Sequence, residues 1–286
     1  MIHEIPFERR TVHGHFSRDL DPIVTVDPGD TVAFSCLNAA WEVAPEELFE
    51  PRDEQLDSGH ALIGPIDVRG AKAGNTLVVH IDKVRPVTFG VTWGNSTKVR
   101  WTLDPDSGTG VDDRGARVRL SPFLGVLGMP PDEPGIHWTG PPRRCGGNID
   151  CKELVAGTAL HLPISVDGAH FSAGDGHALQ ADGEASGTAI ECGIDRAELR
   201  FELSDVELRS PVARTCDSWI AFGFNEDLDL AAEEAMATML DLMERERGLE
   251  RSYALALSSL VVDLRVTQIV NGVKGVHAVL RDDAIG

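Results

Sequence analysis

The sequence has 286 residues, of which 42% are hydrophobic and 25% charged, and its formal net charge is −20 at pH 7. A chain of this length can bury a large core, and this composition is typical of a globular protein rather than a disordered or fibrous one. The excess of negative charge repels polyanions, so we expect neither nucleic acid nor an anionic membrane as a partner. No stretch has the roughly 18 apolar residues of a spanning helix, and the N-terminus lacks an apolar signal region, which predicts a cytoplasmic protein.

Five cysteines stand at positions 36, 145, 151, 192 and 216, without a C-x-x-C pair. An odd number of cysteines in a long chain favours reduced thiols over a disulfide framework. Their spacing also gives little support to a structural zinc site built on sulfur.

The first hundred residues predict β-structure. PIVTVDPGDTVAFSCLN (22–38) alternates apolar and polar residues around an Asp-Pro-Gly-Asp turn, and IGPIDVRGAKAGNTLVVHIDKVRPV (63–87) repeats the order of strand, glycine-containing turn and strand. The shared pattern is typical of hairpin turns.

Residues 102–150 are rich in loop-forming residues. SPFLGVLGMPPDEPGIHWTGPPRRCGGNID (121–150) holds many prolines, but it also carries large apolar side chains that a flexible linker would lack. We therefore expect an ordered, functional loop here. Short strands follow it, in TALHLPISV, AELRFELSDV and SWIAFGF.

The last quarter of the chain changes character. Apolar residues recur at helical spacing from Leu228 to Met243, where Asn225 or Asp227 can cap the start and Gly248 the end. A second helix is expected in SYALALSSLVVDL (252–264), and both helices are interpreted as core packing. RVTQIVNGVKGVHAVL reads as a hairpin with an Asn-Gly turn.

These elements predict a mainly β (α+β) fold with a helical segment near the C-terminus. We expect a single domain over residues 1–286, with an N-terminal β part (1–100) and a site-bearing β part (140–286) whose helices lie within 226–264.

The densest cluster of polar side chains lies in AHFSAGDGHALQADGEASGTAIE (169–191). Asp175 and His177 are two residues apart and share one face of an extended segment, and Asp182 and Glu184 repeat that spacing. A carboxylate beside an imidazole can bind a divalent metal or form an acid–base pair. The alternative is a Gly/Asp-rich surface loop with a solvated histidine, but clustered acids with little Lys or Arg nearby favour a site.

A second candidate is GGNID (146–150), in which two glycines let the chain turn sharply before an amide and a carboxylate. The Asn148 amide can donate to a developing oxyanion. An Asx turn is the structural alternative for this sequence.

Four blocks together resemble the acetamidase/formamidase family, in the family's order. They are GHALIGPIDVRGAKAGNTLVVHI (59–81), GGNIDCKELVAGTALHLPISVDGAHFSAGDGHALQADGEASGTAIE (146–191), DLDLAAEEAMATML (227–240) and QIVNGVKGVHAVL (268–280). The resemblance implies a β-sandwich or barrel architecture, a homodimer or larger oligomer, and hydrolysis of a small linear amide such as formamide or acetamide to carboxylate and ammonia. It also implies a bound divalent metal, zinc or calcium, with zinc as the first expectation because Asp and His ligands favour zinc or a similar first-row ion over magnesium.

The resemblance carries site residues over by motif position. The expected metal ligands are Asp175, His177, Asp150, His60 and His15. The expected catalytic residues are Glu184, Asp182 and Asn148: an acid transfers the proton and the amide stabilises the oxyanion.

Two other readings remain open. One is a β-protein that binds a metal or small ligand without catalysis. The other is a hydrolase of a different C–N bond, in a cyclic amide or a carbamate. A stretch between residues 93 and 141 departs from the family pattern and leaves the amide undetermined.

Overall fold

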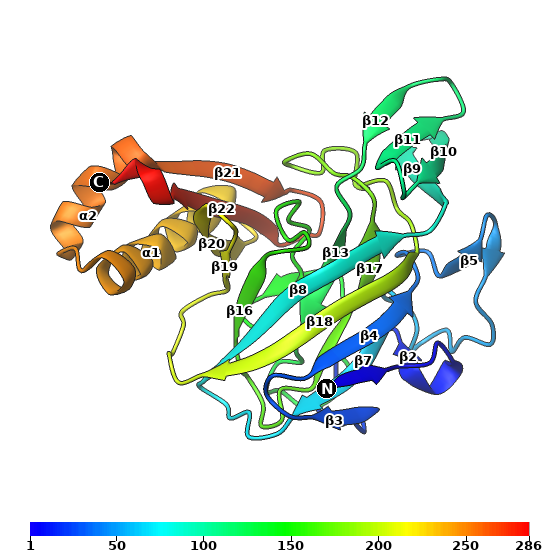
Figure 1. Ribbon diagram of the computed structural model, residues 1–286, viewed down its shortest axis with the longest axis horizontal. Helices are drawn as coiled ribbons and strands as arrows, with labels where there is room; N and C mark the ends of the chain where they lie inside the picture. Colours follow the sequence, from blue (N-terminus) through cyan, green and yellow to red (C-terminus); the bar gives the residue numbers. More distant parts are fainter. Residues whose placement is uncertain (286) are drawn as a thin grey trace.

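The computed structural model describes residues 1–285, and within them the chain is mainly β-strand with two α-helices near the C-terminus (Figure 1). The predicted fold class is therefore confirmed. Two large sheets form the body of the protein, and two smaller sheets lie beside them.

The larger sheet has nine strands and runs from the N-terminal strand to the C-terminal hairpin. In spatial order the strands are β1 (Ile2–Glu4), β4 (Thr31–Cys36), β18 (Ile194–Ser204), β8 (Thr76–Pro86), β16 (Ala159–Pro163), β19 (Val212–Arg214), β20 (Ser218–Asn225), β22 (Lys274–Arg281) and β21 (Val262–Gln268).

The second sheet has seven strands and carries the glycine-rich segments singled out in the sequence. Its order is β14 (Pro142–Arg143), β15 (Gly146–Asn148), β13 (Phe123–Gly128), β17 (Phe171–His177), β7 (Leu62–Val68) and β2 (Val12–His13), with β3 (Val24–Val26) also paired to β7.

The smaller sheets lie to one side of the sandwich (Figure 1). One has the order β12 (Arg117–Arg119), β11 (Thr109–Asp112), β10 (Thr97–Asp104) and β9 (Phe89–Gly94), and the other pairs β5 (Glu42–Ala44) with β6 (Glu47–Leu48). Short 3-10 turns occupy Arg9–Thr11 and Asp282–Ala284.

The main core lies between the two large sheets, as in a β-sandwich. Val79 and Leu199 of the nine-stranded sheet belong to the same buried cluster as Leu124 of the seven-stranded sheet. The rings of Phe171 on β17 and Phe201 on β18 meet edge to face with centroids 5.3 Å apart. Such a pair contributes about 0.5–1.5 kcal/mol beyond the area that it buries.

The two N-terminal strand–turn–strand units are not hairpins. Strand β3 pairs with β7, whereas β4 pairs with β1 and β18 in the other sheet, and β7 and β8 are separated in the same way. The glycine turns are present, with Gly29 and Gly74 at positive φ. Because the following strand crosses the core instead of pairing with its predecessor, each unit joins the two layers of the sandwich.

The segment 102–150, expected to be loop-rich, contains the end of β10 and five further short strands, β11 to β15. Its central part, β13, is entirely buried and lies between β15 and β17. A short apolar run bounded by turn-forming residues is typical of a strand buried on both faces. The many prolines around FLGVLG made this segment look like a loop in the sequence.

The two helices agree with the sequence except at one end. Helix α1 (Leu228–Arg247) begins after Asp227, whose side chain accepts from the N–H groups of Asp229 and Leu230, and it ends at Gly248. Helix α2 (Arg251–Val261) stops three residues earlier than expected, because Val262–Leu264 already belongs to β21.

The C-terminal hairpin is confirmed, with Asn271 and Gly272 in the turn between β21 and β22. Helix α1 packs on this layer; a Cβ on Gly223 of β20 would lie 2.1 Å from the Ala231 carbonyl oxygen, so only glycine allows the approach. Neither helix within residues 1–285 combines the length and apolar character needed to cross a membrane.

Candidate active site

The site is built around Gly125, at the centre of β13. Asp175 and His177 lie on the neighbouring strand β17, and the backbone N–H of Asp150 donates to the Gly125 carbonyl at 3.2 Å. A Cβ on Gly125 would lie 2.6 Å from Asp175 Oδ2, 2.7 Å from Asp150 Oδ1 and 2.8 Å from His177 Cε1. The missing side chain therefore makes the space that these three groups share.

Asp150, Asp175 and His177 form a compact group. His177 Nε2 lies 3.4 Å from Asp175 Oδ2, and His177 Nδ1 lies 3.9 Å from Asp150 Oδ1. One ligand atom from each residue lies within 4.8 Å of the others, and no residue of the three is more than 2% exposed. Three of the five expected metal ligands thus come together.

Two further residues surround this group. Glu191, which the sequence reading did not select, places Oε1 at 3.3 Å from His177 Nε2. His60 Nε2 lies 3.9 Å from Asp175 Oδ2, while its Nδ1 is 2.7 Å from the Thr139 hydroxyl. Glu191 is the last residue of the polar segment 169–191, and this position in the segment is the only feature of the sequence that points to it.

Glu184 lies at the edge of the site. It is 7% exposed and lines a cavity of about 500 Å³ together with Trp101 and Leu179. Burial raises the pKa of Glu184 to about 7, with Glu191 adding to the effect and His177 opposing it. Both the acid and the base form of this carboxyl group are therefore populated near neutral pH.

Charges within the site are strongly coupled. Burial, together with Glu184 and Asp175, raises the pKa of Asp150 well above its ordinary value. Burial alone would raise the pKa of Asp175, but His177 and His60 outweigh it and lower the pKa to about 2. Burial opposes charge on His177 as well, yet Glu191 and Asp175 hold the pKa of this ring well above its usual range. A positive charge next to His177 therefore stabilises the buried carboxylates that surround this ring.

Asp150 is held in place from two directions. Its Oδ2 accepts from Asn271 Nδ2 at 2.6 Å, in the turn of the C-terminal hairpin, and its backbone carbonyl accepts from Gln180 Nε2 at 2.7 Å. Asp150 itself adopts a positive φ of 51°. The hydrogen bond from Asn271 to Asp150 joins segments far apart in the sequence, so no local sequence pattern predicts it.

Several buried polar atoms here lack a hydrogen-bond partner among residues 1–285. They are Asn148 Oδ1, Asp150 Oδ1, Asp175 Oδ1, His177 Nδ1, Gln180 Oε1, Glu184 Oε2 and Glu191 Oε2. Buried polar groups are nearly always paired. Carboxylate oxygens and an imidazole nitrogen left without partners in one place fit the ligand set of a divalent cation.

The remaining expected site residues have other surroundings. Asn148 lies on β15, 2% exposed and opposite Val126 of β13. Asp182 forms an ion pair with Lys152 at 2.9 Å. His15 Nδ1 lies 2.8 Å from the Leu56 carbonyl oxygen, and neither His15 nor His60 belongs to the three-residue ligand group. The roles expected of these residues stay predictions.

Comparison with known proteins identifies the family. The Acetamidase/Formamidase family model matches residues 3–110 and 135–212, and the chain belongs to this family. The match omits residues 111–134, which include β13, and residues 213–286 after its end, and it includes the first part of the stretch between 93 and 141 that was expected to depart from the family.

Relatives of known name agree with the assignment. The chain is 25% identical to the acetamidase of Mycolicibacterium smegmatis over 63% of each chain, and 25% identical to the formamidase of Methylophilus methylotrophus over 60% of this chain and 59% of that one. It thus spans less than two thirds of either relative. The crystal structure of an acetamidase from Bacillus halodurans is 26% identical, with a TM-score of 0.85 over 98% of this chain and 97% of that one.

Proposed function

We propose that this protein hydrolyses a small linear amide of the formamide or acetamide type to a carboxylate and ammonia. The observation that carries the proposal is the buried group of Asp150, Asp175 and His177 beside Glu184, whose pKa is about 7. Family membership and the names of the relatives support the reaction class.

Asp150, Asp175 and His177 are the residues that would hold a divalent cation. Two carboxylates and an imidazole suit zinc better than calcium, which prefers an all-oxygen shell. A bound ion of this kind polarises a carbonyl and lowers the pKa of water. His60 faces Asp175 from the side and helps to keep that carboxylate ionised.

Glu184 is the residue that we assign to proton transfer. Its carboxylate takes a proton from the attacking water and passes it to the leaving nitrogen, a role for which a pKa near the working pH is best. Asp182 was the other candidate, but its side chain is engaged in an ion pair with Lys152, 2.9 Å away. Asn148 is the proposed donor to the developing oxyanion.

The test is ammonia release from formamide, acetamide and propionamide. We expect turnover by the wild type and, for His177→Ala, loss of activity by at least about 100-fold together with loss of copurifying zinc, because imidazole is one of three ligands. His137→Ala, at a half-buried histidine outside this group of ligands, is the matched control and should keep both. If the protein hydrolyses only cyclic amides or carbamates, it is a hydrolase of a different C–N bond and not of linear amides. Metal binding without any turnover would favour a binding protein.

We also propose a homodimer. The expected hairpin cannot pair through β22, which lies between β20 and β21. Its free edge is therefore β21, the last strand at one end of the nine-stranded sheet, with β1 at the other end. Leu264 on β21 is 50% exposed and Leu260 on α2 is 81% exposed. Such apolar exposure next to an open strand edge is typical of an interface.

We expect light scattering to give twice the chain mass at micromolar concentration. Leu260→Glu combined with Leu264→Glu should shift the protein to monomer, because each buried leucine contributes about 1.5–3 kcal/mol. Leu48→Glu, at an exposed leucine of β6, is the control. A wild type with the mass of one chain contradicts the dimer. The cytoplasmic location stays a prediction.

A further inference from the structure

A second group of side chains that can bind a metal lies outside the group of Asp150, Asp175 and His177, which we call the amide site. Cys151 and Glu153 follow β15, and His277 projects from β22, far away in the sequence. Cys151 Sγ lies 3.2 Å from Glu153 Oε2, and His277 Nε2 lies 3.6 Å from the same oxygen. We call these three residues the Cys151 cluster.

His277 is prepared to bind through one nitrogen. Its Nδ1 lies 2.8 Å from the Thr267 hydroxyl, the kind of contact that orients a metal-bound histidine. Its Nε2 has no hydrogen-bond partner within residues 1–285, although the side chain is completely buried.

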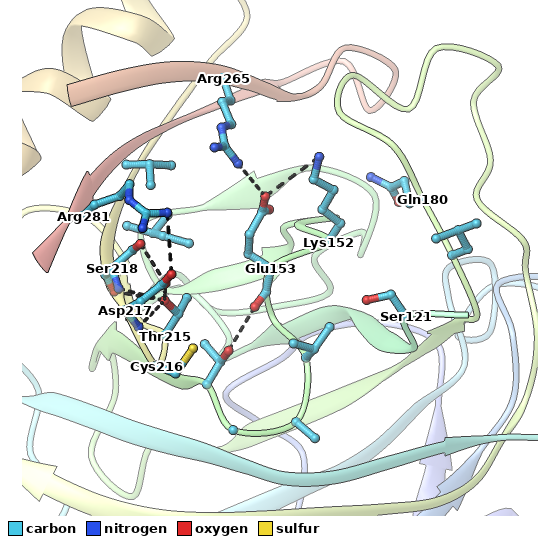
Figure 2. A pocket seen from close by; sticks show the side chains of 17 residues that line it. Ser121, Lys152, Glu153, Gln180, Thr215, Cys216, Asp217, Ser218, Arg265 and Arg281 are labelled. Atoms are coloured by element: carbon cyan, nitrogen blue, oxygen red, sulfur yellow. Dashed lines mark hydrogen bonds and ion pairs between the residues drawn. The ribbon is translucent and has the colours of Figure 1, made fainter. Parts of the chain in front are cut away.

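Glu153 divides its two oxygens between different neighbours. Figure 2 shows Arg265 and Lys152 directed at one carboxylate oxygen, Oε1, at 3.1 and 3.9 Å. The other oxygen, Oε2, faces Cys151 and His277. Cations in the cavity thus hold one oxygen of the carboxylate, while the other oxygen accepts a hydrogen bond from the Cys151 thiol and faces His277 Nε2.

We propose that the Cys151 cluster is a zinc site. Ligand atoms about 2.0–2.3 Å from a tetrahedral zinc ion lie about 3.3–3.6 Å from one another. The two separations from Glu153 Oε2 are close to this spacing, and thiolate, imidazole and carboxylate are all ligands of zinc. Glu153 also lines a cavity of about 490 Å³, on the side of its carboxylate that faces Arg265 and Lys152 (Figure 2).

The position of the ion gives it a structural role. Cys151 directly follows Asp150, and the hairpin that carries His277 also contacts Asp150 through Asn271. Zinc at the Cys151 cluster ties the chain beside the amide site to the C-terminal layer of the nine-stranded sheet. This inference goes beyond the proposed amide hydrolysis and does not depend on it.

Cobalt substitution tests the site, because only a thiolate ligand gives a sulfur-to-cobalt charge-transfer band in the near ultraviolet. We expect this band when the chelator-treated protein is loaded with Co²⁺. Cys151→Ser should abolish it, and His277→Gln should weaken or abolish it. Cys216→Ser is the matched control, since Cys216 is exposed and lines the same cavity.

The two metal sites can be told apart in the same experiment. Asp175→Asn removes a ligand of the amide site and should leave the charge-transfer band unchanged, because that site has no sulfur. A Co²⁺-loaded wild type without the band overturns the Cys151 site, as does a band that disappears in Cys216→Ser and persists in Cys151→Ser. Cys151→Ala, checked for native circular dichroism, guards against an effect of folding in the serine variant.

Discussion

Replacing Glu184 by glutamine should lower the rate of amide hydrolysis by about 10²–10⁴-fold, the usual contribution of one general acid–base group. Glutamine has nearly the same shape but cannot exchange a proton. The wild-type rate should fall as the pH is lowered, because the carboxylate is the form of Glu184 that accepts the proton from water. Ammonia release between pH 5 and pH 9 measures both effects.

The same substitution should stabilise the metal-free protein at high pH. Burial raises the pKa of Glu184 from 4.5 to about 7, so the folded state binds this proton more tightly than the unfolded state does. Its stabilising contribution is complete below about pH 4.5 and is lost as the pH rises through 7. Glutamine stays neutral throughout. We expect Glu184→Gln to raise the free energy of unfolding by about 3 kcal/mol at pH 8 and to leave it nearly unchanged at pH 4.

Denaturant unfolding after chelator treatment measures this difference, and Glu207→Gln, at an exposed glutamate, is the control for lost charge. If Glu184→Gln is inactive and also less stable than the wild type at pH 8, the role of Glu184 is structural and the loss of activity follows from disturbed packing. Unchanged activity would remove Glu184 from the reaction.

Local signals in the sequence predicted the elements that depend on local physics. The side chain of Asp227 and the positive φ of Gly248 delimit α1 as expected, since a helix end is decided by the few residues around it. The turn at Asn271 and Gly272 is equally local. The end of α2 was missed because Val262 and Leu264 continue the apolar pattern while pairing with β22.

Sheet membership could not be predicted in the same way. Asp-Pro-Gly-Asp marks a change of direction, but whether β4 returns beside β3 or crosses to the other sheet depends on partners such as β18, which lies much later in the chain. Pairing between distant strands is decided by the whole core.

The candidate site shows the same division. Asp175 and His177 were found because their spacing places them on one face of a single strand. Asn271 and His277 reach the region around Asp150 and Cys151 through tertiary structure alone. Gly125 was missed for another reason: its importance lies in the side chain that it lacks, and the sequence shows only one glycine among many.

Replacing Gly125 by alanine should therefore have one of the largest effects in the protein. Its φ is not in the left-handed region, so the backbone accepts alanine, but the new Cβ would stand 2.6 Å from Asp175 Oδ2 and 2.7 Å from Asp150 Oδ1. Both carboxylates and the His177 ring, whose Cε1 would lie 2.8 Å from the Cβ, must move away from the new methyl group. A displacement of about 1 Å in a catalytic arrangement can cost about 100-fold in rate, so we expect at least that loss in ammonia release.

Gly94→Ala separates this effect from the general cost of an added methyl group. Gly94 ends β9 with nothing within 4 Å of the position of a Cβ, and its alanine variant should keep wild-type activity and zinc content. Gly125→Ala should lose zinc as well as activity, with a destabilisation of about 1–3 kcal/mol from overpacking. If it instead hydrolyses amides at the wild-type rate, the reaction takes place away from Asp150, Asp175 and His177. The proton-transfer role assigned to Glu184 would then belong to a residue that lines another cavity.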